Sequence, residues 1–164
     1  MRILGVVLLS FLPVFTGVWY YNAQKARVEF INEFYLFICF IKEQIRFSHL
    51  ETDRIMQAAK EQPRFNHAIK EICDMFLERP DENFENMLLK SKNIPTDREA
   101  FKLISDFFCS LGHSDVEGQT ELCLHFGMSF LNLYKKRSLN FSQTQRLIFG
   151  LSFAGGAGIF VLLV

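Results

Sequence analysis

The sequence has little that would build a metal or phosphate site. Its four cysteines lie far apart with no C-x-x-C pair, at Cys39, Cys73, Cys109 and Cys123, and its histidines are scattered as well. Because zinc sites usually bring ligands at close spacing, packing in a protein core is the better interpretation of these cysteines. A phosphate-binding loop is also missing, since no lysine follows the glycine-rich run at 155–158. We therefore expect neither a metal nor another cofactor.

Sustained alternation of apolar and polar residues, which would indicate strands, is also absent. Apolar residues instead recur at helical spacing, as in the stripe Ile31, Phe34, Ile38, Ile41 and Ile45, with Phe30, Phe37, Phe40 and Phe47 beside it. Prolines and caps divide the centre into helices predicted at about 23–47, 52–62, 65–79, 82–90, 96–111 and from 114 onward. Such wide apolar faces predict an all-α bundle of about six helices.

Charged residues are absent from both ends, over 19 residues at 3–21 and 18 residues at 147–164. At about 1.5 Å per residue, each segment reaches about 27–29 Å, close to the ~30 Å hydrocarbon core of a bilayer. The first is longer than the apolar part of a signal peptide and has no A-x-A site after it, so a retained anchor is favoured over a cleaved signal. We predict transmembrane helices at 1–21 and 147–164, flanking a helical domain at 22–146. The predicted first and last helices of this domain can continue into the two spans.

Basic residues predict the orientation of these spans. The domain side has Lys25, Arg27, Lys135, Lys136, Arg137 and Arg146, whereas Arg2 stands alone on the other side. The domain at 22–146 is therefore predicted to be cytoplasmic. Residues 51–121 contain 15 acidic and nine basic residues, which argues against a nucleic-acid partner, whereas the basic stretch 135–146 suits anionic lipid headgroups.

The segment LGHSDVEGQ, Leu111 to Gln119, has the pattern of a boundary between two helices. Gly112 stands where a helix C-terminus favours positive φ. Ser114 and Glu117 form an S-x-x-E capping box, with Asp115 in the first turn complementing the helix dipole. Thr96 and Glu99 repeat this box at an earlier helix. Capping leaves Gln119 unexplained, and we expect a contact there that fixes the helix angle or meets a partner.

The adjacent His113, Ser114 and Asp115 raise the alternative of a membrane-anchored hydrolase. A catalytic triad converges in space, whereas consecutive residues of a turn point in different directions, and no G-x-S-x-G elbow is present. A small pore-forming membrane protein is a further alternative, which the large charged domain between the spans disfavours. We expect no enzyme activity and no small-molecule substrate.

Small residues recur in the second predicted span at Gly150, Ala154 and Gly158. This spacing lets helices approach closely in lipid. We expect packing of this face against the first span or against the span of a partner.

The chain resembles the stage III sporulation protein AB family of endospore-forming bacteria. Its most specific match is to the family's Leu-Gly-x-Ser-Asp-x-x-x-Gln signature, which is met by Leu111, Gly112, Ser114, Asp115 and Gln119. A basic residue followed by a glycine-containing last segment matches as well, through Arg146, Gly150, Gly155 and Gly156. The chain departs from the family at 47–52, where FSHLET replaces a turn containing glycine and proline.

The resemblance implies a role that the residues alone do not. The family is similar to the inner-membrane platform proteins of type II secretion and type IV pilus systems. Its members lie in the mother-cell membrane that faces the forespore. They work beside a secretion-type ATPase, the AA protein of the same operon, and beside other operon products in a trans-envelope channel. A non-enzymatic platform that docks this ATPase is therefore the expected function.

Overall fold

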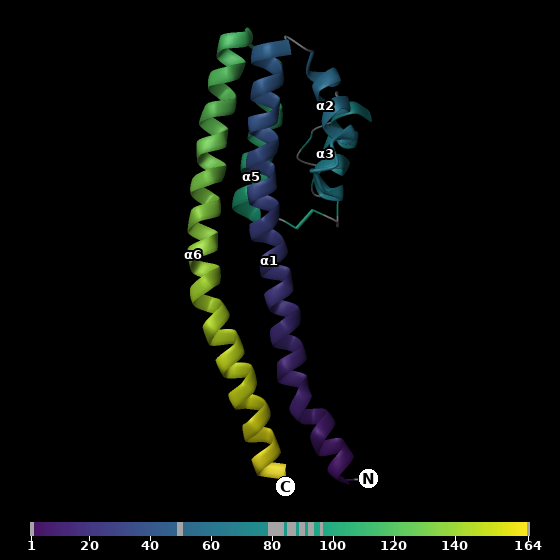
Figure 1. Cartoon of the computed structure of the whole chain (residues 1–164), viewed down its shortest axis with the longest axis vertical. Helices are drawn as coiled ribbons and strands as arrows, with labels where there is room; N and C mark the ends of the chain where they lie inside the picture. The colour runs from purple at the N-terminus through teal and green to yellow at the C-terminus, as the bar shows by residue number, and fades with distance from the viewer. Residues whose placement is uncertain are drawn as a thin grey trace. The chain divides into compact units, whose positions relative to one another are not determined.

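The computed structural model is all-α. It describes residues 2–48, 51–78, 84, 88, 91, 94–95 and 97–163, and within its helices it leaves the side chains of 2–14, 146–149, 151–153 and 155–163 undescribed. Five helices lie in the described part: α1 (Arg2–Ser48), α2 (Thr52–Glu61), α3 (His67–Glu78), α5 (Arg98–Ser110) and α6 (Val116–Leu163) (Figure 1). Most of the helix predicted at 82–90 lies outside the described residues.

The chain divides into two compact units. Unit 1 combines Met1–Ala26 with Lys136–Val164, and unit 2 is Arg27–Lys135. Helices α1 and α6 contribute to both units, because each runs as one helix from an apolar end of the chain into the charged middle. This continuity was expected, since neither glycine nor proline interrupts 21–47. In α6, the weak breaker Ser142 stays helical, with its hydroxyl donating to the Leu139 carbonyl at 2.9 Å.

Phenylalanine builds the core of unit 2. The ring of Phe34 is fully buried and has neighbours from three helices, namely Phe30 and Phe37 on α1, Phe107 and Phe108 on α5, and Phe130 on α6, with centroids 4.7–6.2 Å away. In Figure 1, α1 accordingly lies beside both α5 and α6 within unit 2. Burying one such ring contributes about 1.5–3 kcal/mol, so this cluster is a main source of stability.

The predicted stripe of α1 is confirmed, because all five of its members are at most 5% exposed. Phe47, which was expected to broaden the stripe, is 73% exposed, and that expectation is wrong. It lies one residue from the end of α1, at the edge of the bundle. Phe65 lies outside α3, which begins at His67, and its ring still enters the core against Phe37 and Phe40 at 5.7 and 5.6 Å.

Helices α2 and α3 form a short pair on the other side of α1 from α6 (Figure 1). An ion pair between Lys60 on α2 and Asp74 on α3 joins their outer faces. Ile55 and Ile69 are fully buried and face the core. The pair thus covers a face of α1 that α5 and α6 leave open.

Unit 1 has a different character. Its two helical segments run in opposite directions (Figure 1). The rings of Tyr21 and Phe141 join them, with centroids 5.1 Å apart. Among the residues whose side chains the structure describes, no helical stretch is long and apolar enough to cross a membrane. The spans predicted at 1–21 and 147–164 fall mostly on residues whose side chains are not described.

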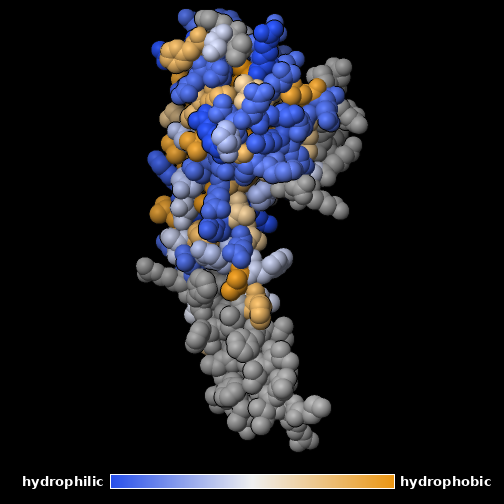
Figure 2. All heavy atoms as spheres, turned by 45° about the vertical axis from the view of Figure 1, so that its right-hand side comes forward, coloured by the Kyte–Doolittle hydropathy of each residue, from blue (hydrophilic) through white to orange (hydrophobic). Residues whose placement is uncertain are grey.

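Charge divides the two units sharply. All 18 acidic residues belong to unit 2, together with 13 of the 18 basic ones. Unit 1 has five basic residues and no acidic residue. Hydrophilic residues accordingly cover most of the face of unit 2 that Figure 2 shows. The formal charges of −5 on unit 2 and +5 on unit 1 cancel only over the whole chain.

Candidate functional site: the turn between the last two helices

Leu111–Gln119, here called the signature turn, begins where α5 ends. The backbone N–H of Leu111 donates to the Phe107 carbonyl at 3.0 Å, and the Leu111 side chain is buried. Gly112 then has φ +89°, the left-handed conformation expected of a glycine just after a helix. A residue with a side chain would be strained there, so Gly112 fixes the direction in which the chain leaves α5.

The cap of the next helix is Asp115, not Ser114. Helix α6 begins at Val116, and the Asp115 carboxylate accepts a hydrogen bond from the Gly118 backbone N–H at 2.9 Å. The cap therefore lies one residue later than predicted, and Gly118, three residues after it, has no side chain to complete a capping box. Ser114 and Asp115 are both good caps, and the carboxylate has the additional attraction of the helix dipole.

The same displacement occurs at the start of α5. Thr96, the predicted cap, lies outside the described residues, while α5 begins at Arg98 with Asp97 as its cap. Asp97 accepts from the backbone N–H groups of Glu99 at 3.1 Å and of Ala100 at 3.0 Å. In both places a hydroxyl residue precedes an aspartate, and the aspartate caps the helix.

Gln119 closes the signature turn. Its side-chain amide donates to the backbone carbonyl of Ser114 at 2.8 Å, and its backbone N–H donates to the Asp115 carbonyl at 2.9 Å. Gly118 makes room for this arrangement, because a Cβ there would lie 2.9 Å from Asp115 Oδ1 and 3.0 Å from Ser114 Oγ. The side chain of Gln119 therefore bonds within the signature turn, and a role in the angle between α5 and α6 or in partner contact stays a prediction. Gly118 is a turn residue that sequence reasoning missed.

The hydrolase alternative finds no support in this geometry. His113, Ser114 and Asp115 are all exposed, and none of the hydrogen bonds or ion pairs of these described residues joins two of them. The Asp115 carboxylate faces the Gly118 amide instead of orienting an imidazole. Nucleophilic catalysis needs that orientation, whereas the side-chain hydrogen bonds of Asp115 and Gln119 cap α6.

The cysteines divide into two classes. Cys73 and Cys123 are buried in the core, and burial raises the pKa of each thiol to about 12. Cys39 is half-buried, and Cys109 is exposed, so the expectation of core packing is wrong for Cys109. Within the described residues no three His, Cys, Asp or Glu side chains are placed to hold a metal ion.

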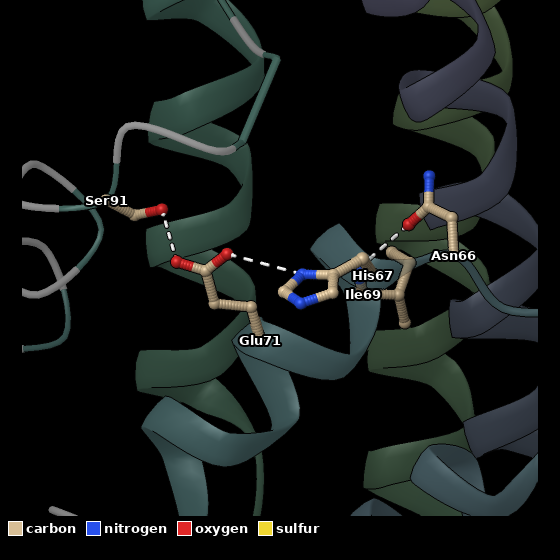
Figure 3. A network of polar contacts seen from close by, with 5 residues as sticks. All are labelled: Asn66, His67, Ile69, Glu71 and Ser91. Carbon is tan, nitrogen blue, oxygen red and sulfur yellow. Dashed lines mark hydrogen bonds and ion pairs between the residues drawn. The ribbon is translucent and has the colours of Figure 1, made fainter.

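A second polar network lies at the start of α3 (Figure 3). Asn66 caps this helix by accepting from the Ile69 backbone N–H at 3.0 Å. Glu71 accepts a hydrogen bond from the Ser91 hydroxyl at 2.7 Å, and His67 Nδ1 lies 3.9 Å from its other oxygen. Ser91 belongs to the connection between α3 and α5, so this network ties that connection to α3. Sequence reasoning did not find it, because its partners stand 20 residues apart.

An open hollow of about 600 Å³ lies along the outer face of α5. The residues that line it are Arg98, Glu99, Lys102, Leu103 and Asp106. Charges of both signs surround a single leucine there, which suits contact with another protein more than binding of an apolar ligand.

The small residues expected to pack in the second span are only partly described. Gly150 and Ala154 are exposed, and a Cβ at Gly150 would meet nothing within 4 Å. The surroundings of Gly158 lie outside the described residues. At Gly150, packing against a partner therefore stays open as the expectation, and packing within the chain is not seen.

Comparison with known proteins identifies the family. A family model described as stage III sporulation protein AB matches residues 2–164, so the chain belongs to this family of sporulation proteins. No curated protein and no solved structure matched the chain. The resemblance drawn from the signature turn and the glycine-containing last segment is thereby confirmed.

Proposed function

We propose that this member of the stage III sporulation protein AB family is a non-enzymatic membrane platform of a sporulation channel. Residues 1–21 and 147–164 anchor it as transmembrane helices in the mother-cell membrane around the forespore. The helical bundle between them, 22–146, lies in the cytoplasm and docks the secretion-type AA ATPase, alongside other products of the operon. The family match supports the role in sporulation, and the resemblance to secretion platforms supplies the ATPase as the partner.

The observation that carries the membrane proposal is the segregation of charge. Segments 3–21 and 147–164 contain no charged residue, while all 18 acidic residues lie in unit 2 between them. A charge at the centre of a bilayer costs about 2.5–3.5 kcal/mol or more, so uncharged ends and a charged middle match a bilayer and an aqueous compartment. The basic residues beside both ends favour a cytoplasmic middle.

The exposed Cys109 provides a test of this topology. In non-sporulating cells that express the full chain with Cys39→Ser in their surface membrane, a membrane-impermeant maleimide should label Cys109 only after the membrane is opened. Cys73 and Cys123 should stay unlabelled in both conditions, because they are buried. A Cys109→Ser variant is the matched control. Labelling of Cys109 in intact cells would place unit 2 outside and contradict the proposal.

Docking of the ATPase is tested with the full chain in lipid nanodiscs. The hollow on α5 supports this helix as the docking face, so Glu99→Lys should weaken binding of the purified AA ATPase at least tenfold. Asp53→Lys introduces the same charge change on α2 and serves as the control. Loss of binding in Asp53→Lys alone would indicate that the ATPase docks on α2 and not on α5. Absence of binding by the unaltered chain would refute the docking role.

A further inference from the structure

The exposed side chains of unit 1 change in character along α1. Phe15 and Trp19 are 71% and 75% exposed, and Tyr20 is 47% exposed. Lys25 is exposed as well, and it lies about 9 Å beyond Trp19 along the helix axis. An apolar level is thus followed by an aromatic level and then by a basic one. Aromatic residues with basic residues beside them are typical of the boundary between hydrocarbon and headgroups.

Helix α6 also presents a basic side chain near this level of unit 1. The contact between Tyr21 and Phe141 aligns the two antiparallel segments of unit 1. Lys25 lies four residues beyond Tyr21, and Lys136 lies five residues before Phe141, so the two lysines stand at nearly the same level. Leu139, between Lys136 and Phe141, is 65% exposed. Each helix therefore presents an exposed lysine with an exposed large apolar side chain within about 9 Å along its axis, Tyr20 on α1 and Leu139 on α6.

We propose that these side chains, here called the unit 1 belt (Trp19, Tyr20, Lys25, Lys136 and Leu139), bind a bilayer leaflet with a preference for anionic lipid headgroups. The proposal rests on the membrane anchoring proposed above and specifies the lipid. Charge complementarity carries it: unit 1 has five basic residues and no acidic residue that would repel an anionic headgroup. The exposed aromatic side chains place these charges at headgroup depth.

The chain contains one tryptophan, Trp19, and it lies in the belt. Its fluorescence therefore reports directly on the lipids around the belt. The full chain is reconstituted in vesicles of phosphatidylcholine and phosphatidylglycerol, with bromine on the acyl chains of one lipid at a time. Brominated phosphatidylglycerol should quench Trp19 more strongly than brominated phosphatidylcholine at the same mole fraction. Added salt should reduce this preference, because it screens the lysines.

Two variants test the lysines. Lys25→Gln and Lys136→Gln should each lower the relative association constant for phosphatidylglycerol about fivefold. Arg54→Gln, on the exposed face of α2 in unit 2, is the matched control and should leave the constant unchanged. Equal quenching by the two lipids, or an unchanged preference in both belt variants, would overturn the proposal while the anchor stands. Quenching by neither lipid would show that Trp19 is not in the bilayer and would refute the anchor itself.

Discussion

The two units use the same two long helices, yet their aromatic side chains meet different surroundings. In unit 2, Phe30, Phe34 and Phe37 of α1 are at most 1% exposed, whereas Phe15 and Trp19 of the same helix are more than 70% exposed in unit 1. The difference comes from α2, α3 and α5, which belong only to unit 2. The chain itself buries the apolar face of α1 in unit 2, whereas Phe15 and Trp19 are left exposed in unit 1.

Charge follows the same division. Unit 2, which has a buried core, carries every acidic residue, and unit 1, where Phe15, Trp19 and Leu139 are exposed, carries none. A water-exposed surface tolerates both signs of charge, while a surface beside anionic headgroups favours only the basic sign. The comparison therefore predicts that the same substitution has different effects in the two units.

The largest difference is expected for phenylalanine removal. Phe34→Ala should destabilise the full chain in detergent by about 3–5 kcal/mol, because the lost ring has neighbours on three helices. Phe15→Ala should change the stability by less than about 0.5 kcal/mol, since its side chain is exposed. Denaturant unfolding followed by circular dichroism measures both. Equal losses would mean that the two units share one core and would break the comparison.

Adding one methyl group should also separate the units. Gly118→Ala places a Cβ against Asp115 and Ser114 in the signature turn, and we expect a loss of about 1–3 kcal/mol. Gly150→Ala adds the same group where nothing lies within 4 Å, so no loss is expected. The same unfolding measurement compares them. A destabilising Gly150→Ala that also disrupts assembly with a partner would locate the expected packing of the second span.

A smaller effect should distinguish the two candidate caps of α6. Asp115→Ala should cost about 0.5–2 kcal/mol, because the Gly118 backbone N–H loses its partner. Ser114→Ala should cost less than about 0.5 kcal/mol, since Ser114 contributes its backbone carbonyl, which the substitution keeps. Asp97→Ala repeats the test on α5. The reverse ranking would restore Ser114 as the cap.

These caps also show where sequence reasoning is sufficient. Helical spacing predicted the stripe of α1, because a buried face must recur every three or four residues. The absence of glycine and proline from 21–47 predicted the continuity of α1. It placed both caps one residue early, because hydroxyl and carboxylate residues stand side by side and both favour this position. Only the backbone geometry decides between such neighbours.

Sequence reasoning mainly missed contacts between residues that are far apart in the sequence. The hydrogen bond between Ser91 and Glu71 joins residues 20 positions apart, and no periodicity encodes it. The exposure of Phe47 and Cys109 has the same origin, because helical spacing gives a face but not what covers it. The sequence singled out Gln119 but could not identify its partner, because that partner is the backbone carbonyl of Ser114, a group that every residue has.

Glu33 departs from the pattern of unit 2, where acidic groups otherwise tend to face water. One of its carboxylate oxygens is buried without a hydrogen bond, and burial together with Glu29 raises its pKa above the ordinary 4.5. Glu33→Gln should therefore stabilise the chain at pH 7, by less than about 1 kcal/mol, while Glu43→Gln, on an exposed part of α1, should not.

The pH dependence of Glu33→Gln follows from the direction of this shift. A raised pKa means that the folded chain loses stability as pH rises from 4.5 through the folded-state pKa of Glu33, because the unfolded chain ionises first. The gain from Glu33→Gln should therefore be constant above that range and vanish below pH 4.5, where the carboxyl is protonated in both states. A gain that persists at pH 4 would show that packing, and not buried charge, distinguishes the variant.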